Sequence, residues 1–486
     1  MLLRLLPVIH VLGGMLMFFS ITYLMPIAAS LIYGDDTVTE FVDAMVIAAG
    51  IGALMWLLTR SHKRELKPRD GFLLVTLAWI LMAAIATVPL MLVIDGLSFT
   101  DAFFETMSGL STTGATVLSG LEKLPPAINL WRHELNWLGG MGIIVLAVAI
   151  LPLLGVGGMQ LVKAETTGVN KDAKLTARIA DTAKALWSTY FVITVACILS
   201  LKAVGMTWLD AICHAFAAMG LGGFSTYDAS VGQFDSPAIE AVLIVFMMLA
   251  ALNFATHFMV WRQRSLRVYL RDVEAKGVVV LIVVSTLSCA AYLWWFDTYP
   301  EFLTSLRHVA FNLVSIATDC GFVSQDYDKW PAFVPLWMLF LSCITVSSGS
   351  TGGGIKMVRT LILGRQALVE LKRLIHPQVV APVKVGDMVV SQQVAGAVLG
   401  FIFLYILTIG ELTFFLIASG LDFTSSITAI VACINNAGPG LNVVGPAQNY
   451  QALTDFQVWV CSAAMLIGRL EVMTVFVLLT PAFWKK

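Results

Sequence analysis

The segment DAFFETMSGLSTTGATVLSG, residues 101–120, is apolar enough to enter a membrane but too short to cross one. As a helix, residues 101–111 extend about 16 Å, roughly half of the ~30 Å hydrocarbon core. Such a segment must enter and leave by the same face. The small and hydroxyl residues that follow, centred on Gly114, predict a turn that returns the chain to that face.

The same pattern occurs three more times along the chain. In each copy a short helix-like run leads into small or polar residues around a glycine, and a polar stretch follows. The copies read LDAICHAFAAMGLGGFSTYD (209–228), LRHVAFNLVSIATDCGFVSQDYD (306–328) and SSITAIVACINNAGPGLNVVG (425–445). The equivalent glycines are separated by 109, 98 and 117 residues, and they are Gly114, Gly223, Gly321 and Gly438. A repeat of this length predicts pseudo-fourfold symmetry.

The composition places the whole chain in a membrane. Of its 486 residues, 58% are hydrophobic and 13% are charged, against roughly 25% charged in an ordinary soluble domain. The mean hydropathy is +0.85. These values exclude a water-soluble globular protein, a disordered chain and a disulfide scaffold. The net charge of −1 provides no basic field for nucleic acid, so no nucleic-acid partner is expected.

Ten apolar runs have the length of about 20 residues that a helix needs to cross the hydrocarbon core. They cover residues 9–33, 41–59, 72–94, 137–158, 185–204, 238–260, 277–296, 332–362, 392–419 and 455–483. The predicted fold is an all-α polytopic membrane protein with four pseudo-symmetric helix–pore-loop–helix repeats around a central ion pore, plus two additional N-terminal helices. The predicted domains are 1–69 for the two N-terminal helices and 70–162, 163–262, 263–388 and 389–486 for the four repeats.

The basic residues predict which side of the membrane each connection faces. Segments 60–70, 163–184, 262–276 and 356–387 hold 21 of the 30 lysines and arginines, and three more lie at the termini. The other connections are acidic or neutral. By the positive-inside rule the basic segments and both termini are cytoplasmic. The four short segments therefore enter from the outer side.

Four glycine-centred loops around one axis predict a cation pore. Non-helical backbone at membrane depth is tolerated only where it is buried in protein or lines an aqueous path. Backbone carbonyl groups that point inward can replace the hydration shell of a monovalent cation. Glycine permits the backbone angles that turn carbonyl groups toward an axis. The C-terminal ends of the short helices add negative potential near the ion.

The stretch SSGSTGGGIK, residues 347–356, interrupts the eighth apolar run. Its three consecutive glycines disfavour a helix, because each costs about 1 kcal/mol relative to alanine. We interpret it as a mobile loop beneath the filter that obstructs the pore; the alternative is a close crossing of helices through small residues. The stretch lacks the GK[ST] ending of a phosphate-binding loop and has no strand before it, which excludes nucleotide binding here.

Arg469 lies in the last apolar run, where an arginine near a helix centre costs about 2.5–3.5 kcal/mol on insertion scales. Glu471 is close in sequence but does not share a helix face with it, so we expect no local ion pair. We interpret Arg469 as a positive charge at the inner mouth that slows ions and interacts with the glycine loop. The alternative is a buried pair with a carboxylate on another helix.

At these residues the sequence resembles the membrane subunits of Trk-type bacterial potassium uptake systems (TrkH and TrkG, within the Trk/Ktr/HKT superfamily). The resemblance covers essentially the whole chain. It rests on FFETMSGLSTTGAT (103–116), NWLGGMGIIVLAVAILPLLGVGGMQL (136–161), GGFSTYDASVGQFDSP (222–237), GSTGGGIK (349–356), ELKRLIHP (370–377), NNAGPGL (435–441) and GRLEV (468–472). It implies K⁺ as the transported ion, with no bound organic cofactor in this chain.

The resemblance also implies which residues form the site. A potassium filter is implied at Thr112, Thr113, Gly114, Leu221, Gly222, Gly223, Asp319, Cys320, Gly321, Asn436, Ala437 and Gly438. An intramembrane gate is implied at Gly349, Ser350, Thr351, Gly352, Gly353, Gly354 and Arg469. One departure is Asp319, where neutral residues are expected. Beside the ion path its carboxylate raises cation occupancy; pointing away, it caps the short helix before it.

The implied partners are a second copy of the chain, membrane lipid and a cytosolic ring of NAD- or nucleotide-binding subunits (TrkA) that docks on the basic inner segments. The implied location is the bacterial inner membrane. A coupled symporter of potassium with protons or sodium is the alternative function, with relay candidates Glu411, His214, His257 and His308. An enzyme is not expected, because neither an HExxH motif nor a phosphorylation site is present.

Overall fold

The computed structural model describes residues 2–62, 66–149, 175–379, 381–386 and 388–485, and the regular secondary structure of this part is helical apart from one small hairpin. The helices are α1 (Leu2–Phe19), α2 (Leu24–Tyr33), α3 (Val38–Thr59), α4 (Pro68–Val93), α5 (Phe99–Leu110), α6 (Pro126–Ala149), α9 (Leu175–Ala203), α10 (Trp208–Gly220), α11 (Pro237–Ala251), α12 (Phe254–Gln263), α13 (Arg267–Arg271), α14 (Val273–Trp295), α15 (Phe302–Ala317), α16 (Phe333–Ile344), α17 (Met357–Ile375), α18 (Gln392–Ala418), α19 (Phe423–Asn435), α20 (Asp455–Arg469), α21 (Val472–Leu479) and α22 (Pro481–Trp484). A small antiparallel hairpin joins β1 (Lys384–Val385) to β2 (Met388–Val389). Short 3-10 turns lie at Ser20–Tyr23, Arg60–His62, Leu121–Lys123, Ser230–Phe234, Tyr327–Lys329, Asn442–Val444 and Tyr450–Ala452.

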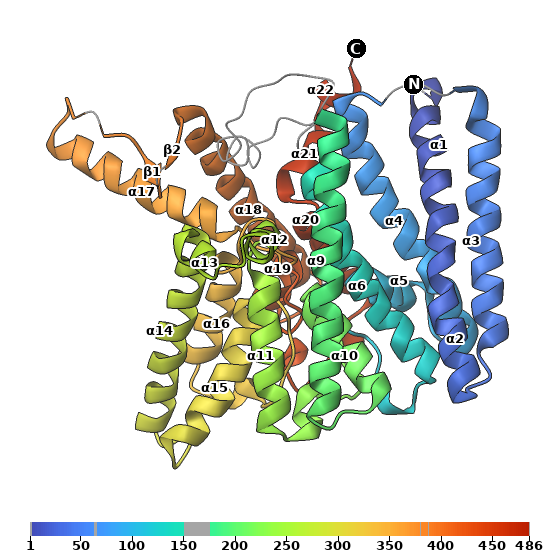
Figure 1. The fold of residues 1–486 in the computed structure, drawn as a ribbon, viewed down its shortest axis with the longest axis horizontal. Helices are drawn as coiled ribbons and strands as arrows, with labels where there is room; N and C mark the ends of the chain where they lie inside the picture. Colours follow the sequence, from blue (N-terminus) through green and yellow to red (C-terminus); the bar gives the residue numbers. More distant parts are fainter. Residues whose placement is uncertain (1, 63–65, 150–174, 380, 387, 486) are drawn as a thin grey trace.

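Long helices form the body of the molecule. In Figure 1, α1, α3, α4 and α9 each have one end at the upper end of the molecule, where both chain termini also lie. Among the described residues, six helices are continuous, long and apolar enough to cross a membrane: Leu5–Tyr33, Val38–Thr59, Arg69–Val93, Asp181–Ala203, Val273–Trp295 and Gln392–Ala418. They confirm six of the ten predicted runs and establish a multi-pass membrane protein.

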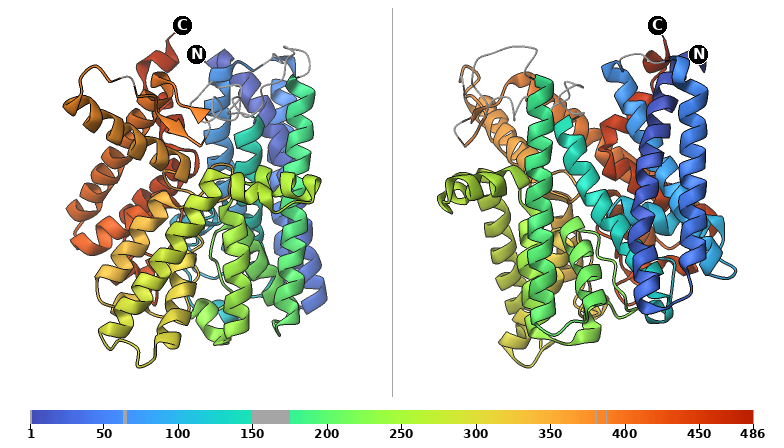
Figure 2. Two further views of the ribbon diagram at one scale, coloured as in Figure 1. Left: turned by 60° about the vertical axis from the view of Figure 1, so that its left-hand side comes forward. Right: turned by 45° about the vertical axis from the view of Figure 1, so that its right-hand side comes forward.

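The prediction of one continuous helix over 238–260 is wrong. α11 ends at Ala251, and α12 begins after Asn253 at an angle of 98°. The Asn253 side chain accepts a hydrogen bond from the Ala255 amide (2.8 Å), so it caps a new helix inside the apolar run. Figure 2 shows α12, in yellow-green, lying across the long helices in its left-hand view.

The last predicted run, 455–483, is also broken. α20 and α21 meet at an angle of 109°. Glu471 stands between them with a backbone φ of +61°, which an α-helix cannot contain. The break ends α20 at Arg469, which is its final residue.

Two further runs differ from their predicted form. Run 332–362 is two helices, α16 and α17, with the glycine-rich stretch between them. The helix predicted over 137–158 begins earlier, at Pro126, because proline is favoured at the first position of a helix. The second half of that run and most of the basic segment 163–184 lie outside the described residues.

The four short segments fold as predicted, as α5, α10, α15 and α19. Each packs between the helix before it and the helix after it: α4 and α6, α9 and α11, α14 and α16, and α18 and α20. Their N-termini are capped alike in two copies, since Ser98 and Thr207 accept hydrogen bonds from the amides of Asp101 and Asp210 (3.1 Å each). The four-repeat architecture predicted from the glycine spacing is therefore present.

Candidate functional site: a ring of four loops above a glycine-rich segment

The four short helices end in one repeated backbone pattern. In each copy the amide of the residue before the key glycine donates a 2.8 Å hydrogen bond to the carbonyl oxygen five residues earlier. The pairs are Thr113 to Ser108, Gly222 to Ala217, Cys320 to Ser315 and Ala437 to Ala432. These bonds close the last helical turn, and the chain then reverses direction.

Backbone angles repeat in the same register. Two residues before each glycine the backbone is left-handed, with φ of +55°, +55°, +64° and +58° at Thr112, Leu221, Asp319 and Asn436. The glycines are also left-handed, with φ of +79°, +60°, +91° and +85° at Gly114, Gly223, Gly321 and Gly438. A non-glycine residue in this region is uncommon. Four such residues in register indicate that the fold requires this geometry.

The four glycines form a closed ring. A Cβ atom added to any one of them comes closer than 3.0 Å to a carbonyl oxygen of the next copy. The glycine and carbonyl pairs are Gly114 with Gly222, Gly223 with Cys320, Gly321 with Ala437, and Gly438 with Thr113. The order runs through copies 1, 2, 3 and 4 and returns to copy 1. All twelve predicted filter residues belong to the loops that form this ring.

The ring offers oxygen atoms rather than ionisable ligands. Among the described residues, no group of three or more His, Cys, Asp or Glu side chains is placed to hold a metal ion. Carbonyl and hydroxyl oxygens are the ligands that hard monovalent cations accept. The Thr113 hydroxyl lies 2.7 Å from the Ser111 hydroxyl and accepts a 3.0 Å bond from Asn436, which links copies 1 and 4.

The glycine-rich stretch lies against the inner ends of the short helices. Thr351 donates its hydroxyl hydrogen to the carbonyl oxygen of Met219 at the end of α10 (3.0 Å). A Cβ atom on Gly353 comes closer than 3.0 Å to the carbonyl oxygen of Asn435 at the end of α19. These contacts place the glycine-rich stretch against the last residues of α10 and α19.

The same stretch completes the broken end of α11. The amides of Ser347 and Thr351 donate to the carbonyl oxygens of Ala251 (3.0 Å) and Ala250 (3.4 Å). These carbonyl groups lose their helical partners where α11 stops. The break after Ala251 and the glycine-rich stretch thus satisfy each other's backbone groups, as buried polar groups require.

Arg469 joins the glycine-rich stretch to α6. Its guanidinium donates to the carbonyl oxygen of Thr351 at 2.7 Å and to that of Gly139 at 2.8 Å. Only 3% of the residue is exposed. As expected, Glu471 is not its partner, because Glu471 pairs with Arg359 at 2.7 Å. The partners shown for Arg469 are backbone carbonyls, which favours the predicted interaction with the glycine loop over a buried ion pair.

Asp319 points toward the glycine-rich stretch. One of its carboxylate oxygens accepts a hydrogen bond from the Gly353 amide at 3.0 Å. The glycine-rich stretch ends in a cation, Lys356. Lys356 in turn donates to the carbonyl oxygen of Gly352. The carboxylate therefore connects the third loop of the ring to the segment beneath, and it does not cap the short helix before it.

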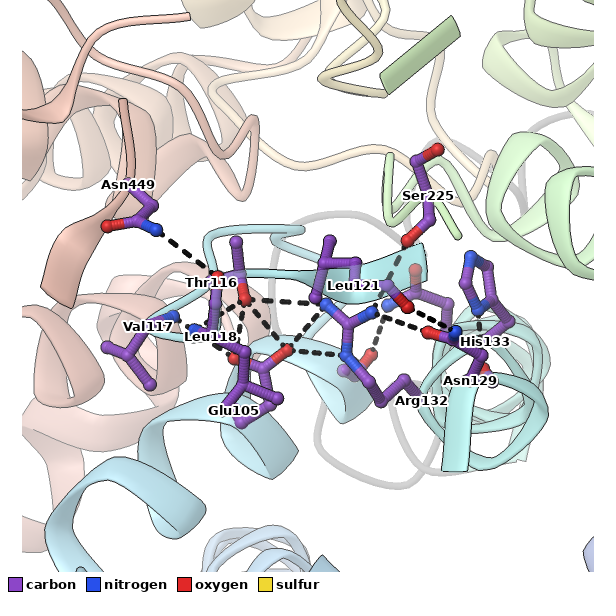
Figure 3. Close-up of polar contacts among 12 residues, drawn as sticks. Glu105, Thr116, Val117, Leu118, Leu121, Asn129, Arg132, His133, Ser225 and Asn449 are labelled. Atoms are coloured by element: carbon purple, nitrogen blue, oxygen red, sulfur yellow. Dashed lines mark hydrogen bonds and ion pairs between the residues drawn. The ribbon is translucent and has the colours of Figure 1, made fainter. Parts of the chain in front are cut away.

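Sequence reasoning missed a buried ion pair beside the ring. Glu105 on α5 and Arg132 on α6 lie 2.7 Å apart, and neither side chain has exposed surface. Figure 3 shows Arg132 between Glu105 and the backbone of Ser225. The signal was an arginine within an apolar segment, but the fourth run was predicted to begin only at residue 137, which left Arg132 in a loop.

Comparisons with known proteins agree with this architecture. The family described as "TrkH: Cation transport protein" matches residues 38–486. The chain is 45% identical over 480 residues to the Trk system potassium uptake protein TrkH of Halomonas elongata, with 99% of each chain covered. It is 43% identical over 478 residues to the protein of the same description from Escherichia coli, with 98% of this chain and 99% of that one covered.

A solved structure has the same fold. The crystal structure of the potassium transporter TrkH from Vibrio parahaemolyticus matches with a TM-score of 0.91 and 41% identity, over 99% of this chain and 100% of that one. The resemblance noted in the sequence is confirmed, and so are the fold class and the prediction that the chain is a transporter rather than an enzyme. The chain belongs to the TrkH family of cation transport proteins.

Proposed function

We propose that the chain conducts potassium ions into the cell as the gated, channel-like subunit of an uptake system. The closed ring of four glycine loops is the observation that carries this proposal, because a backbone carbonyl oxygen of each copy lies against the key glycine of its neighbour. The relatives described as potassium uptake proteins support K⁺ as the ion. An inside-negative potential drives uptake by about 2.3 kcal/mol per 100 mV.

The proposed filter consists of the three residues that end at each key glycine. They are Thr112–Gly114, Leu221–Gly223, Asp319–Gly321 and Asn436–Gly438. Their shared backbone angles and hydrogen bonds support equal roles for the four copies. The carbonyl oxygens replace the water molecules of the ion as it passes.

The proposed gate consists of residues 349–354 with Arg469. The stretch contacts the ends of α10 and α19 and the carboxylate of Asp319, and this position beneath the ring supports obstruction of the path. Opening requires that the stretch release Arg469, which holds it to α6. Glycines at these positions give the segment the freedom to move once its contacts break.

We also propose a homodimer in the bacterial inner membrane, with both termini in the cytoplasm and a cytosolic NAD- or nucleotide-binding ring as regulator. The two termini lie at the same end of the molecule (Figure 1). α17 extends from that half and exposes apolar side chains beside basic ones, which supports contact with another chain. The exposed apolar residues of α17 are Leu368, Leu371, Leu374 and Ile375.

Coupled symport with protons or sodium is less well supported. His214, one of the relay candidates, contacts the Asp210 carbonyl oxygen (2.9 Å) and the Ser225 hydroxyl (3.0 Å). His257 contacts the Tyr269 hydroxyl (2.7 Å) and the Leu249 carbonyl oxygen (2.8 Å). Each histidine is bonded to residues within 11 or 12 positions of itself, and none of these bonds joins the two histidines to each other as a relay would require.

Isotope flux in proteoliposomes tests the proposal. With the purified chain we expect potassium and rubidium to enter much faster than sodium, and the flux to reverse at the potassium equilibrium potential at every pH. A reversal potential that shifts with the proton or sodium gradient contradicts uncoupled transport. Equal entry of sodium contradicts the filter.

A further inference from the structure

We propose that Glu105 and Arg132 are positioning residues that hold the filter loops of copies 1 and 2 in place and thereby set ion selectivity. The inference rests on the proposed filter. Neither residue lies in the ring itself. Each is bonded to the non-helical segment that follows one of the key glycines, which we call the exit segment of that copy, so both act on the ion through the backbone.

Glu105 is bonded to the exit segment that follows Gly114. One carboxylate oxygen accepts hydrogen bonds from the Thr116 hydroxyl at 2.9 Å and from the Val117 amide at 3.2 Å. The other oxygen accepts from Nε of Arg132 at 2.7 Å. The carboxylate therefore joins α5, the exit segment of copy 1 and α6 (Figure 3).

Arg132 extends the connection to copy 2. Its guanidinium donates to the carbonyl oxygen of Ser225 at 3.3 Å and lies 4.4 Å from the ring centre of Phe224. These two residues directly follow Gly223. Asn129, one turn earlier on α6, accepts a further bond at 3.2 Å and fixes the orientation of the guanidinium plane. One planar cation thus links two adjacent loops of the ring.

The other copies carry different side chains at the same position. In copies 1, 2 and 3 the residue nine positions before the key glycine is Glu105, His214 and Asn312, respectively. Each bonds to a residue of the exit segment, two or three positions after that glycine. The bonds are Glu105 to Thr116 (2.9 Å), His214 to Ser225 (3.0 Å) and Asn312 to Ser324 (2.9 Å). In copy 4 that position is Ala429, and the neighbouring Thr428 accepts a bond from the Leu441 amide (3.0 Å).

Because the bond recurs, we infer that a side-chain bond between the short helix and the exit segment is needed to hold each filter loop. Copy 1 alone builds it from a buried carboxylate and balances the charge with an arginine. Buried charge-assisted bonds are shorter and stronger than neutral ones. The arginine fork is planar and always charged, so lysine does not replace it where two partners must be held at once.

The test is Arg132→Lys, which keeps the charge beside Glu105 and removes the fork that reaches Ser225. We expect the potassium-to-sodium permeability ratio to fall about tenfold, which corresponds to about 1.4 kcal/mol of lost discrimination. A purely structural role lowers the flux of every ion together and leaves the ratio unchanged. The measurement is the reversal potential in proteoliposomes with potassium and sodium on opposite sides.

Arg307→Lys is the matched control. Arg307 pairs with Glu240 at 2.8 Å and with Asp235 at 2.9 Å, and neither partner belongs to a filter loop. We therefore expect the potassium-to-sodium permeability ratio of the Arg307→Lys variant to equal the wild-type value. Thr116→Val is a second variant that leaves no charge unpaired, and we expect a fall of about threefold.

Wild-type ratios in both Arg132→Lys and Thr116→Val overturn the inference. If Gly223→Ser also keeps the wild-type ratio, the filter assignment fails as well. If that glycine variant alone loses selectivity, only the positioning role of Glu105 and Arg132 is lost.

Discussion

The ring and the glycine-rich stretch differ in what holds them in place. The ring repeats one backbone geometry four times, and each key glycine lies against a backbone carbonyl oxygen of the next copy. The glycine-rich stretch occurs once and is held by ionisable side chains, with Arg469 and Asp319 bonded to its backbone. The ring has little room to rearrange, because each key glycine lies in close contact with the next copy. The glycine-rich stretch can change position once a small number of charge-assisted hydrogen bonds break.

Under the proposed function, selectivity and gating rest on different kinds of interaction. Backbone carbonyls carry partial charges whose positions are set by the fold, so they discriminate between ions without changing state. Buried ionic contacts act in a medium of low dielectric constant, where each is strong and its loss is costly. Substitutions in the ring should therefore change which ion passes, and substitutions at the segment should change how often ions pass.

Gly223→Ser gives the largest expected effect on the ring. Its Cβ comes closer than 3.0 Å to the Cys320 carbonyl oxygen, and its φ of +60° strains any side chain. We expect the potassium-to-sodium permeability ratio to fall about a hundredfold, or ~2.7 kcal/mol, as measured by reversal potentials in proteoliposomes. Gly410→Ser, which meets open space on α18, is the control. Wild-type ratios after the same change at all four glycines remove the distinction between ring and segment.

Arg469→Ala tests the segment. The variant loses hydrogen bonds to the carbonyl oxygens of Thr351 and Gly139, and a bond to a charged group contributes about 1.5–3 kcal/mol. We expect rubidium influx without any cytosolic partner to rise about tenfold, while the permeability ratio stays unchanged.

Arg469→Lys keeps the charge but holds fewer partners, so its influx should lie between the wild-type and alanine values. An alanine variant with wild-type influx and only a lower yield of folded protein contradicts the gate.

Asp319→Asn gives the smallest expected effect, because asparagine still accepts a hydrogen bond from the Gly353 amide. The bond loses its charge assistance, and neutral bonds are roughly half as strong. We expect rubidium influx to rise about threefold with an unchanged concentration for half-maximal influx. A weaker apparent affinity for rubidium at an unchanged maximal rate instead places the carboxylate in the ion path, on the side of the ring.

The repeated parts of the molecule were predictable from the sequence because repetition makes the signal stronger. One glycine-centred loop is ambiguous, but four at similar spacing predicted α5, α10, α15 and α19 and the glycines of the ring. The contacts between copies were not predictable in the same way. Which carbonyl oxygen faces Gly114 depends on packing between segments about 100 residues apart.

The breaks in the helices could not be derived from hydropathy alone. Residues 238–260 have the composition of one spanning helix, and the helix stops because residues 347–351 bind its carbonyl groups. Asn253, a good capping residue inside an apolar run, was the local signal. Arg132 was visible as a charge in apolar surroundings, but its partners lie 27 and 93 residues away.

Because one chain supplies all four quarters of the ring, each substitution changes only one position in the ring. In a ring of four identical subunits, a change in one codon alters four positions together, and the altered assembly must tolerate all of them. Here the carboxylate of Glu105 stands in one quarter and that of Asp319 in another. Each quarter can diverge separately, so an asymmetric ring can be adjusted one quarter at a time.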